Sequence, residues 1–327
     1  MSVFTRIETP ELAAFLAGYP VGALRSFTGI ESGIENTNYF VSTTTGEYVL
    51  TLFERVDPAD LPFFLQLTAF LAEHAIPCAH PVRGGNGEYV GTLHGKNAAL
   101  VMRLYGQSVT APSLAHCAAI GAALGQMHKA GAAFVFGGER PNPRGPRWWR
   151  ATAERLAGHL GTEDAGILEE ELRFQGLYRF ADLPRGICHA DLFRDNALFD
   201  GERLTGVIDF YYACTDTWLY DLAITVNDWA SEADGRLDFG RAEALVAAYQ
   251  QVRALTSIER GAWPVLLRAA ALRFWLSRLA DLHFPRAGEL THTKDPLVFR
   301  RILMARRQET PRLRRLWPGP GPGPGQA

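Results

Sequence analysis

The sequence has little lysine, no surplus of either charge and no long apolar run that is free of charges. Lysine is found at three positions, Lys96, Lys129 and Lys294. The 33 basic residues are nearly balanced by 35 acidic ones, and a net charge of −2 gives no electrostatic basis for a dedicated nucleic-acid binder. The most apolar run, 262–276, contains Arg268 and Arg273, so we expect no membrane span.

Cysteine is also scarce, and the spacing of the cysteines excludes domains that are stabilised by disulfides or by zinc. The four cysteines are Cys78, Cys117, Cys188 and Cys214. They lie far apart and form no C-x-x-C pair, which is typical of a reduced chain and not of a disulfide or zinc framework. Glu8 and Glu11 stand where a signal peptide would have a basic and then an apolar stretch. We therefore expect a globular, cytoplasmic protein, whose oligomeric state the composition does not predict.

The residue pattern of the first hundred residues is typical of a small β-sheet. Residues 37–43 and 47–53 are β-branched and aromatic runs separated by a Thr-Gly turn, and 89–93 and 98–104 are predicted to form a further hairpin. Between these pairs, the spacing of the apolar residues predicts a helix over 58–75. An antiparallel sheet with one main helix is therefore expected in the N-terminal part.

After residue 106 the chain is mainly helical. Apolar periodicity predicts helices over 113–130, 147–160, 163–180, 218–230, 241–255 and 257–282. One β-like island, 187–210, interrupts them, and alternating Pro and Gly near the C-terminus predict a disordered tail. The predicted class is α+β, with an N-terminal nucleotide-binding lobe (1–105), a larger helical catalytic and substrate-binding lobe (106–316) and a tail (317–327).

The island carries the motif with the clearest chemistry. His189, Asp191 and Asn196 have the spacing H-x-D-x-x-x-x-N, and an apolar strand that ends in Asp209-Phe210 follows. These residue types fit phosphoryl transfer: a carboxylate that accepts or orients a hydroxyl, and two oxygen ligands suited to Mg²⁺. Asp191 is the candidate base, and Asn196 and Asp209 are the candidate metal ligands. We expect His189 to orient the loop as a hydrogen-bond donor, and short strands over 196–199 and 204–208 to form a hairpin that brings Asp209 beside Asn196.

A second polar cluster lies in the turn that leads into the expected strand 37–43. It contains Ser32, Gly33, Asn36 and Asn38. Small and amide residues allow backbone N–H groups to approach phosphates, although such clusters also make ordinary turns. Because this cluster opens a sheet lobe that precedes the H-x-D motif, we favour nucleotide binding.

These residues resemble the aminoglycoside phosphotransferase/choline kinase superfamily, which has a protein-kinase-like fold, and within it the type II homoserine kinases. The resemblance runs over 21–315. Five stretches carry it, GIENTNYFV (33–41), YVLTLFE (48–54), HADLFRDNALF (189–199), DLAITVNDW (221–229) and LRFWLSRLADLHFPRAGELTHTKDP (272–296). The resemblance implies ATP and Mg²⁺ as cofactors, and phosphorylation of the side-chain hydroxyl of L-homoserine in threonine biosynthesis.

The resemblance also implies roles for individual residues. Asp191 becomes the catalytic base, Asn196 and Asp209 the ligands of Mg²⁺, and Asp221 a buried aspartate that braces the catalytic loop. Residues 101–106 become an inter-lobe hinge against adenine. The two hinge residues that we expect at the nucleotide are Met102 and Leu104.

One departure from the family pattern concerns the phosphate clamp. Kinases of this fold place a lysine on the third strand and pair it with a glutamate on the following helix. Here the lysine position falls on or beside Thr51, and Gln66 stands where the partner acid is expected. Arg55 and Arg103 are candidate replacements, and each is equally well explained as a surface arginine.

The acceptor site must bind a zwitterion that carries a hydroxyl. An arginine fork suits the carboxylate, and Arg273 and Arg278 lie in an otherwise apolar helix. Asn227 and Asp228 are candidate acceptors for the ammonium. A structural ion pair between one of these arginines and Asp228 or Asp281 is an equally weighted alternative.

Other acceptors and a non-catalytic role remain alternatives. A polycationic aminoglycoside would need an acidic groove, whereas 297–327 has seven arginines against Glu309 alone and is expected to be a solvated basic face. A choline cage could use Trp229, Phe274 and Trp275, and methylthioribose is not excluded. A pseudokinase is favoured only by the missing strand lysine. Protein kinase activity is disfavoured because the motif after the strand is not D-F-G.

Overall fold

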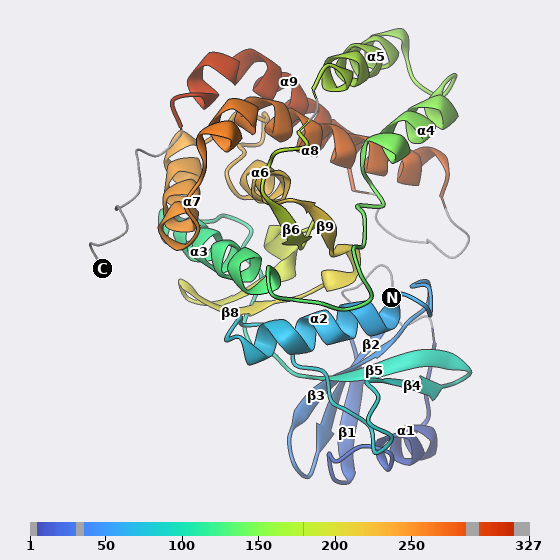
Figure 1. Ribbon diagram of the computed structural model, residues 1–327. Helices are drawn as coiled ribbons and strands as arrows, with labels where there is room; N and C mark the ends of the chain where they lie inside the picture. The colour runs from blue at the N-terminus through green and yellow to red at the C-terminus, as the bar shows by residue number, and fades with distance from the viewer. Residues whose placement is uncertain (1–4, 31–35, 179, 286–293, 317–327) are drawn as a thin grey trace. The chain divides into compact units, whose positions relative to one another are not determined.

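The computed structural model describes residues 5–30, 36–178, 180–285 and 294–316, and the chain divides into two compact units. The first unit combines Met1–Gly106 with two later segments, Phe134–Gly137 and Thr205–Tyr211, and the second unit holds the rest. The predicted α+β class is confirmed, because an antiparallel sheet dominates the first unit and helices dominate the second (Figure 1). Within the described ranges, every helix is too short or too polar to cross a bilayer. The expected tail, 317–327, lies outside these ranges.

The sheet of the first unit has five strands in the order β1-β2-β3-β5-β4. Its strands are β1 (Leu24–Gly29), β2 (Thr37–Thr43), β3 (Glu47–Leu52), β4 (Val90–Leu93) and β5 (Lys96–Met102). Every pair of neighbours is antiparallel, and the predicted runs 37–43 and 47–53 are strands β2 and β3. In this register, Thr51 lies opposite Asn38 on one side and Ala99 on the other.

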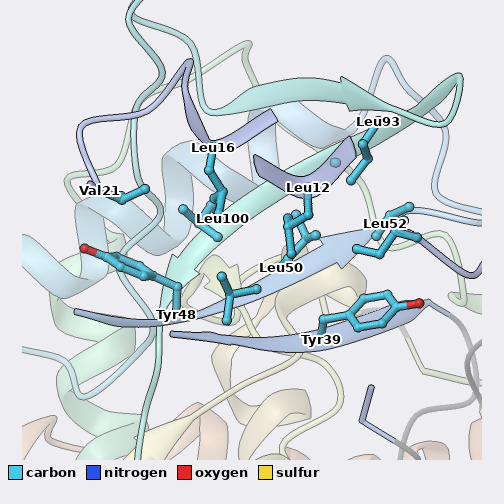
Figure 2. Close-up of a cluster of buried hydrophobic side chains, with 12 residues drawn as sticks. Leu12, Leu16, Val21, Tyr39, Tyr48, Leu50, Leu52, Leu93 and Leu100 are labelled. Carbon is cyan, nitrogen blue, oxygen red and sulfur yellow. The ribbon is translucent and has the colours of Figure 1, made fainter. Parts of the chain in front are cut away.

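One face of the sheet packs against a short helix that the sequence prediction missed. Helix α1 (Thr9–Leu16) buries Leu12 and Leu16 against Leu50 and Leu52 of β3 (Figure 2). Because side chains alternate along a strand, Thr51 points to the opposite face. The N-terminal lobe therefore has two helices, where we expected one main helix.

Helix α2 (Leu61–Glu73) packs on the same face of the sheet as Ala99, and it lies within the predicted range 58–75. Leu61 and Leu65 pack there with Phe53, and Tyr211 joins them from the later segment of the unit. The ring of Tyr211 meets that of Phe53 edge-on, with centroids 5.4 Å apart. The residues just after Asp209 are therefore part of the first unit's core.

The second unit contains seven α-helices among its described residues. They are α3 (Leu114–Gly131), α4 (Pro146–Leu156), α5 (Thr162–Gly176), α6 (Trp218–Trp229), α7 (Phe239–Val252), α8 (Ser257–His283) and α9 (Pro296–Leu313). Six of them match predicted segments, while α9 was missed because arginines dilute its apolar stripe. Strand β6 (Arg185–Cys188) pairs with β9 (Cys214–Thr217), and β7 (Ala197–Asp200) pairs with β8 (Arg203–Val207) in the expected hairpin.

Helices α3 and α7 pack at very short range, which requires a glycine. A Cβ on Gly121 would lie 2.1 Å from the carbonyl oxygen of Leu245 in α7. Such a distance is far inside van der Waals contact, so only glycine allows this approach. The close packing brings Tyr249 of α7 against His128 of α3.

The predicted solvated basic face of the C-terminal region is wrong for the buried and paired arginines of α9, whereas Arg312, Arg314 and Arg315 are exposed. Arg306 of α9 is fully buried, and its guanidinium donates to Glu309, to Asn227 and to the carbonyl oxygen of Gly235. Other arginines of α9 pair with acids of α5, as Arg307 does with Glu170. Burial lowers the pKa of Arg306 to about 10, which still leaves it charged at neutral pH. These arginines stabilise helix packing instead of forming an open basic surface.

Candidate active site

The H-x-D loop begins where β6 ends. Cys188 is the last residue of β6 and pairs with Cys214 of β9, and β9 leads directly into α6. The loop then crosses to a short 3₁₀ turn, Arg194–Asn196, before β7 begins. The first turn of α6 carries Asp221, so the strand pair and the helix bring Asp221 to the start of the loop.

Asp221 holds the loop by its main chain. Its carboxylate accepts hydrogen bonds from the amides of His189 and Ala190, at 2.7 and 2.8 Å. Ala190 has φ of 62°, a left-handed conformation that costs a non-glycine residue about 1–2 kcal/mol. Burial would by itself raise the pKa of Asp221, but hydrogen bonds from His128 and from the loop amide outweigh it and lower that pKa. An ionised Asp221 therefore holds the backbone in a strained shape, in agreement with the bracing role that the resemblance implies.

The strained turn directs Asp191 toward a neutral amide and a cation. The Nδ2 atom of Asn196 donates to the main-chain oxygen and to Oδ2 of Asp191, at 2.8 and 3.1 Å. The Nη1 atom of Arg273 lies 3.7 Å from Oδ1 of the same carboxylate. The ring of His189 orients the loop as expected, but in its bond with the Asp191 amide (3.3 Å) the nitrogen Nδ1 accepts and does not donate. Asp191 is thus held as an ordered hydrogen-bond acceptor.

Asn196 is oriented in a way that suits a metal ligand. Because its Nδ2 is engaged by Asp191, its oxygen Oδ1 is the atom left to accept, and no described residue donates to it. Asp209 belongs to the first unit and has φ of 65°, another left-handed residue at a motif. An amide oxygen and a carboxylate are the ligands that Mg²⁺ prefers. The donor chemistry therefore fits a divalent metal, and the pairing of Asn196 with Asp209 stays a prediction.

Of the four residues expected at the nucleotide phosphates, Ser32 and Gly33 lie outside the described residues. Asn36 is buried, and its Oδ1 accepts from the amide of Glu54 at 3.3 Å, which ties the start of β2 to the end of β3. Asn38 accepts from the hydroxyl of Thr51 at 2.7 Å. Both asparagines thus tie β2, the strand that follows the predicted phosphate-binding turn, to the region of β3.

The position of the missing strand lysine is filled by a hydrogen-bonded Thr51. Its hydroxyl donates to Oδ1 of Asn38 at 2.7 Å. Lys96 does not replace the lysine, because it pairs with Glu54 and with the hydroxyl of Thr5 at the N-terminal segment.

The two candidate arginines are placed differently by the structure. Arg103 pairs with Glu47 at 3.6 Å and lies over the ring of Phe40, with its guanidinium carbon 4.0 Å from the ring centroid. These contacts explain Arg103 as a side chain that covers the sheet. Arg55 is half-buried after β3, and its candidacy as a phosphate clamp stays a prediction.

The predicted hinge follows the end of β5. Met102 is its last strand residue, with 53% of its surface exposed, and its amide donates to the carbonyl oxygen of His80. The next amide, of Arg103, donates to the carbonyl oxygen of Glu47. The amide of Leu104 donates to no residue in the described part of the chain, which leaves it available to an adenine edge.

The two arginines predicted to bind the acceptor reach different neighbours. Arg273 is 4% exposed, and its guanidinium stacks on the ring of Phe274, 3.6 Å from the centroid, beside Asp191. Arg278 donates to the carbonyl oxygen of Asp295 at 2.9 Å, and burial lowers its pKa. Only Arg273 contacts the candidate base.

The two predicted ammonium acceptors are already engaged inside the second unit. Asn227 is fully buried, its Nδ2 donates to the carbonyl oxygen of Leu267, and its Oδ1 accepts from Arg306. A buried amide with both ends bonded offers nothing to a substrate, so we correct that prediction. Asp228 accepts from the amide and the Nε of Arg194, at 2.8 and 3.1 Å. The alternative partner for Asp228 is therefore Arg194 and neither of the helix arginines.

Sequence reasoning missed two cations beside the loop. Arg194 ties the loop to Asp228 and also donates to the carbonyl oxygen of Thr110. Lys294 pairs with Asp195 at 2.6 Å, next to the candidate metal ligand. Lys294 could have been found, because it is one of three lysines and lies in a stretch that carries the resemblance.

The chain is similar to known phosphotransferases over most of its length. The profile of the phosphotransferase enzyme family matches residues 26–255. A homoserine kinase of Methylobacillus flagellatus is 53% identical over 303 residues, which cover 93% of this chain and 94% of that protein. A homoserine kinase of Paraburkholderia phytofirmans is 46% identical, over 94% of this chain and 96% of that protein.

Solved structures share the fold at low sequence identity. An amicoumacin kinase in complex with AMP-PNP and Ca²⁺ superposes with a TM-score of 0.68 at 16% identity, over 92% of this chain and 94% of that one. An aminopropanol kinase superposes with a TM-score of 0.64 at 17% identity, over 93% of this chain and 98% of that one. Both likenesses extend over nearly the whole chain.

Proposed function

The chain belongs to the phosphotransferase enzyme family, and from that premise we propose that it is a homoserine kinase. It transfers the γ-phosphate of ATP to the side-chain hydroxyl of L-homoserine and forms O-phospho-L-homoserine and ADP. The relatives at 46–53% identity support the acceptor, since they span more than nine-tenths of the chain. The reaction serves threonine biosynthesis, as the resemblance implies, and the spacing of the cysteines favours the cytoplasm as its place.

The observation that carries the proposal is the construction of the H-x-D loop. Asp221 fixes the amides of His189 and Ala190, the left-handed turn follows, and Asn196 holds the carboxylate of Asp191 in one orientation. Because the transition state of phosphoryl transfer is loose, catalysis depends more on positioning the reacting groups than on a strong base. The strained turn holds the carboxylate of Asp191 in one orientation, and this positioning suits such a reaction.

In the transfer step, Asp191 accepts the hydrogen bond of the acceptor hydroxyl and orients its oxygen toward the γ-phosphorus. A new O–P bond forms as the bond between the γ-phosphorus and the bridging oxygen breaks, and ADP leaves with that oxygen's electron pair. The hydroxyl proton passes to Asp191 late in the step, when the new ester bond makes it acidic. Arg273 lies 3.7 Å from Oδ1 of Asp191, so a cation stands beside the carboxylate that takes this role.

For the metal, the oxygen of Asn196 and the carboxylate of Asp209 are the residues that would hold Mg²⁺. When bound, Mg²⁺ neutralises charge on the phosphate oxygens of the nucleotide. The orientation of the Asn196 amide supports this assignment, because its nitrogen is turned to Asp191 and its oxygen is the remaining ligand. The solved relative that holds AMP-PNP with Ca²⁺ supports a divalent ion together with a nucleotide.

At the nucleotide, Asn36 and Asn38 order the strands beside the phosphate-binding turn that contains Ser32 and Gly33. The hinge at Met102 and Leu104 takes the adenine. The unengaged amide of Leu104 supports this, since an adenine ring nitrogen accepts such a bond.

Acceptor recognition rests on charge. Arg273 supplies a guanidinium for the homoserine carboxylate within reach of the base, and the mostly buried Asp228 supplies a carboxylate for the ammonium. Arg278, further along α8, contributes a second positive charge near the loop acids Asp191 and Asp195. A neutral sugar or a quaternary amine has no carboxylate to pair with the guanidinium of Arg273, which disfavours methylthioribose and choline as acceptors.

The test is ADP release from ATP-Mg²⁺ by the purified chain with L-homoserine, L-threonine, choline, methylthioribose or kanamycin as acceptor. We expect turnover with L-homoserine well above that with the other four. Turnover with another of them would keep the phosphotransfer and overturn the acceptor. No turnover with any of them, while ATP still binds, would favour the pseudokinase alternative.

A further inference from the structure

The bracing carboxylate of Asp221 is the end of a longer chain of buried side chains. The Nε2 atom of His128 lies 3.0 Å from Oδ2 of Asp221, and its Nδ1 lies 2.7 Å from the hydroxyl of Tyr249. That hydroxyl in turn lies 3.1 Å from Nη1 of Arg253, at the C-terminal end of α7. Three helices, α3, α6 and α7, thus contribute to one continuous series that ends at the H-x-D loop.

The direction of every proton in this series follows from the chemistry of its ends. An arginine has donors only, so the oxygen of Tyr249 accepts from Arg253 and its proton must point elsewhere. It points to Nδ1 of His128, which therefore carries no proton, and the proton of the ring lies on Nε2 and is donated to Asp221. Burial lowers the pKa of His128, in agreement with a neutral ring. The series runs Arg253, Tyr249, His128, Asp221, with each member donating to the next.

The same geometry argues against a metal site at His128, Cys188 and Asp221. His128, Cys188 and Asp221 offer ligand atoms within 4.8 Å of one another, a distance that a bound ion would suit. However, the carboxylate already receives His128 and the amides of His189 and Ala190. Burial also raises the pKa of Cys188 well above its usual value, which keeps it a thiol, and Sγ lies 3.6 Å from the carbonyl oxygens of Gly186 and Thr217. These side chains therefore form a hydrogen-bond network around Asp221 and not a metal site.

The outer end of the series is anchored as firmly as the inner end. Arg253 pairs at 2.8 Å with Glu259, which is fully buried in the first turn of α8 and caps that helix through Thr256. The guanidinium of Arg253 lies over Trp218, and the ring of Trp218 stacks on His128 at 18°. The imidazole is therefore held between a flat indole and two hydrogen bonds, with no freedom to turn.

We propose that Tyr249 and Arg253 are positioning residues for phosphoryl transfer, which act on Asp191 through His128 and Asp221 by fixing the tautomer and the ring plane of the imidazole. This proposal rests on the proposed function only in naming Asp191 as the base. Loss of the Tyr249 hydroxyl frees the second nitrogen of His128, so the donor to Asp221 is no longer specified. Asp221 is then held less firmly, and the strained turn at Ala190 loses part of the support that keeps it in its left-handed conformation.

The first test compares Tyr249→Phe with Tyr220→Phe. Tyr220 is 4% exposed, and its hydroxyl is buried without a hydrogen-bond partner in the described part of the chain, so it provides a matched loss of one buried oxygen. We expect Tyr249→Phe to lower kcat for homoserine about 10-fold or more with the KM for ATP unchanged, and Tyr220→Phe to stay within about twofold of the parent chain. Equal kcat values for the two variants would overturn the proposal.

The second test does not need turnover. In ¹⁵N-histidine-labelled protein, the ring nitrogens of His128 should show the neutral tautomer protonated at Nε2, and Tyr249→Phe should shift the Nδ1 signal. A ring protonated at Nδ1 in the parent chain would contradict the proton direction. Because this readout does not involve homoserine, it separates failure of the positioning series from failure of the proposed substrate.

Discussion

The Nη1 atom of Arg273 lies 3.7 Å from Oδ1 of Asp191, so a nearly buried cation from α8 stands beside the proposed base of the H-x-D loop. Such a guanidinium can serve the carboxylate of the substrate, the carboxylate of Asp191, or both. The two roles differ in the kinetic constant that they change, because ground-state binding sets KM whereas alignment of the base sets kcat.

For Arg273→Met, we predict that the KM for homoserine rises by about 10- to 100-fold, while the KM for ATP is unchanged. The measurement is steady-state kinetics with each substrate varied in turn. An acceptor control is 3-amino-1-propanol, which is homoserine without its carboxylate. The parent chain should discriminate strongly against this amine, and Arg273→Met should lose most of that discrimination. A fall in kcat with KM and discrimination intact would assign Arg273 to Asp191 alone.

For the metal, we predict that Asn196→Ala raises the Mg²⁺ concentration needed for half-maximal turnover by about 10-fold or more, and that Asp209→Ala abolishes Mg²⁺-dependent turnover. The measurement is initial rate against total Mg²⁺ at fixed ATP. Asp200→Asn, at an exposed residue that pairs with Arg203 on the surface, is the control for loss of a nearby carboxylate. If all three variants share one Mg²⁺ dependence, the metal assignment is wrong.

The ion pair of Glu54 predicts a pH dependence of stability. Burial alone would raise the pKa of Glu54, but hydrogen bonds from Lys96, Thr37 and Thr5 outweigh burial and lower the pKa below its ordinary 4.5. The unfolded chain therefore binds this proton more readily, so the stabilisation is complete above pH 4.5 and is lost as pH falls through the lowered pKa.

In urea unfolding between pH 6 and pH 3, Glu54→Gln should accordingly lose less stability on acidification than the parent chain does. Glu88→Gln, at an exposed loop residue, provides the matched removal of one charge. Parallel curves for Glu54→Gln and the parent chain would show that the carboxylate titrates alike in the folded and unfolded states.

The pattern of the sequence was enough to predict the fold class and most elements of the helical unit. Apolar periodicity found α2 and six later helices to within a few residues, and the alternation over 37–43 gave β2 with the observed bounds. It missed α1, which has only eight residues, and α9, in which arginines interrupt the stripe. Those arginines are paired or buried only because α5 supplies acids and α8 supplies a packing surface, and a local pattern does not contain such long-range partners.

The candidate site was predictable only in part, for a related reason. The spacing of Asp191 and Asn196 puts both on one short loop, so local geometry decides their contact, and the structure shows it. Asn227 was predicted at the substrate because it ends a helix near the loop, but it bonds Arg306 from 79 residues away. Tyr249 and His128 carried no signal in the sequence, because the close approach at Gly121 that brings them together is a tertiary property.

We propose that Asp191 acts as the base toward the hydroxyl of L-homoserine. The most direct measurement is the rate of O-phospho-L-homoserine formation, followed by ³¹P NMR, for the parent chain and for Asp191→Asn, with ATP affinity measured in parallel. We predict that Asp191→Asn lowers kcat by about three orders of magnitude or more while ATP binding is retained. Near-normal turnover by Asp191→Asn would contradict the assignment of the loop.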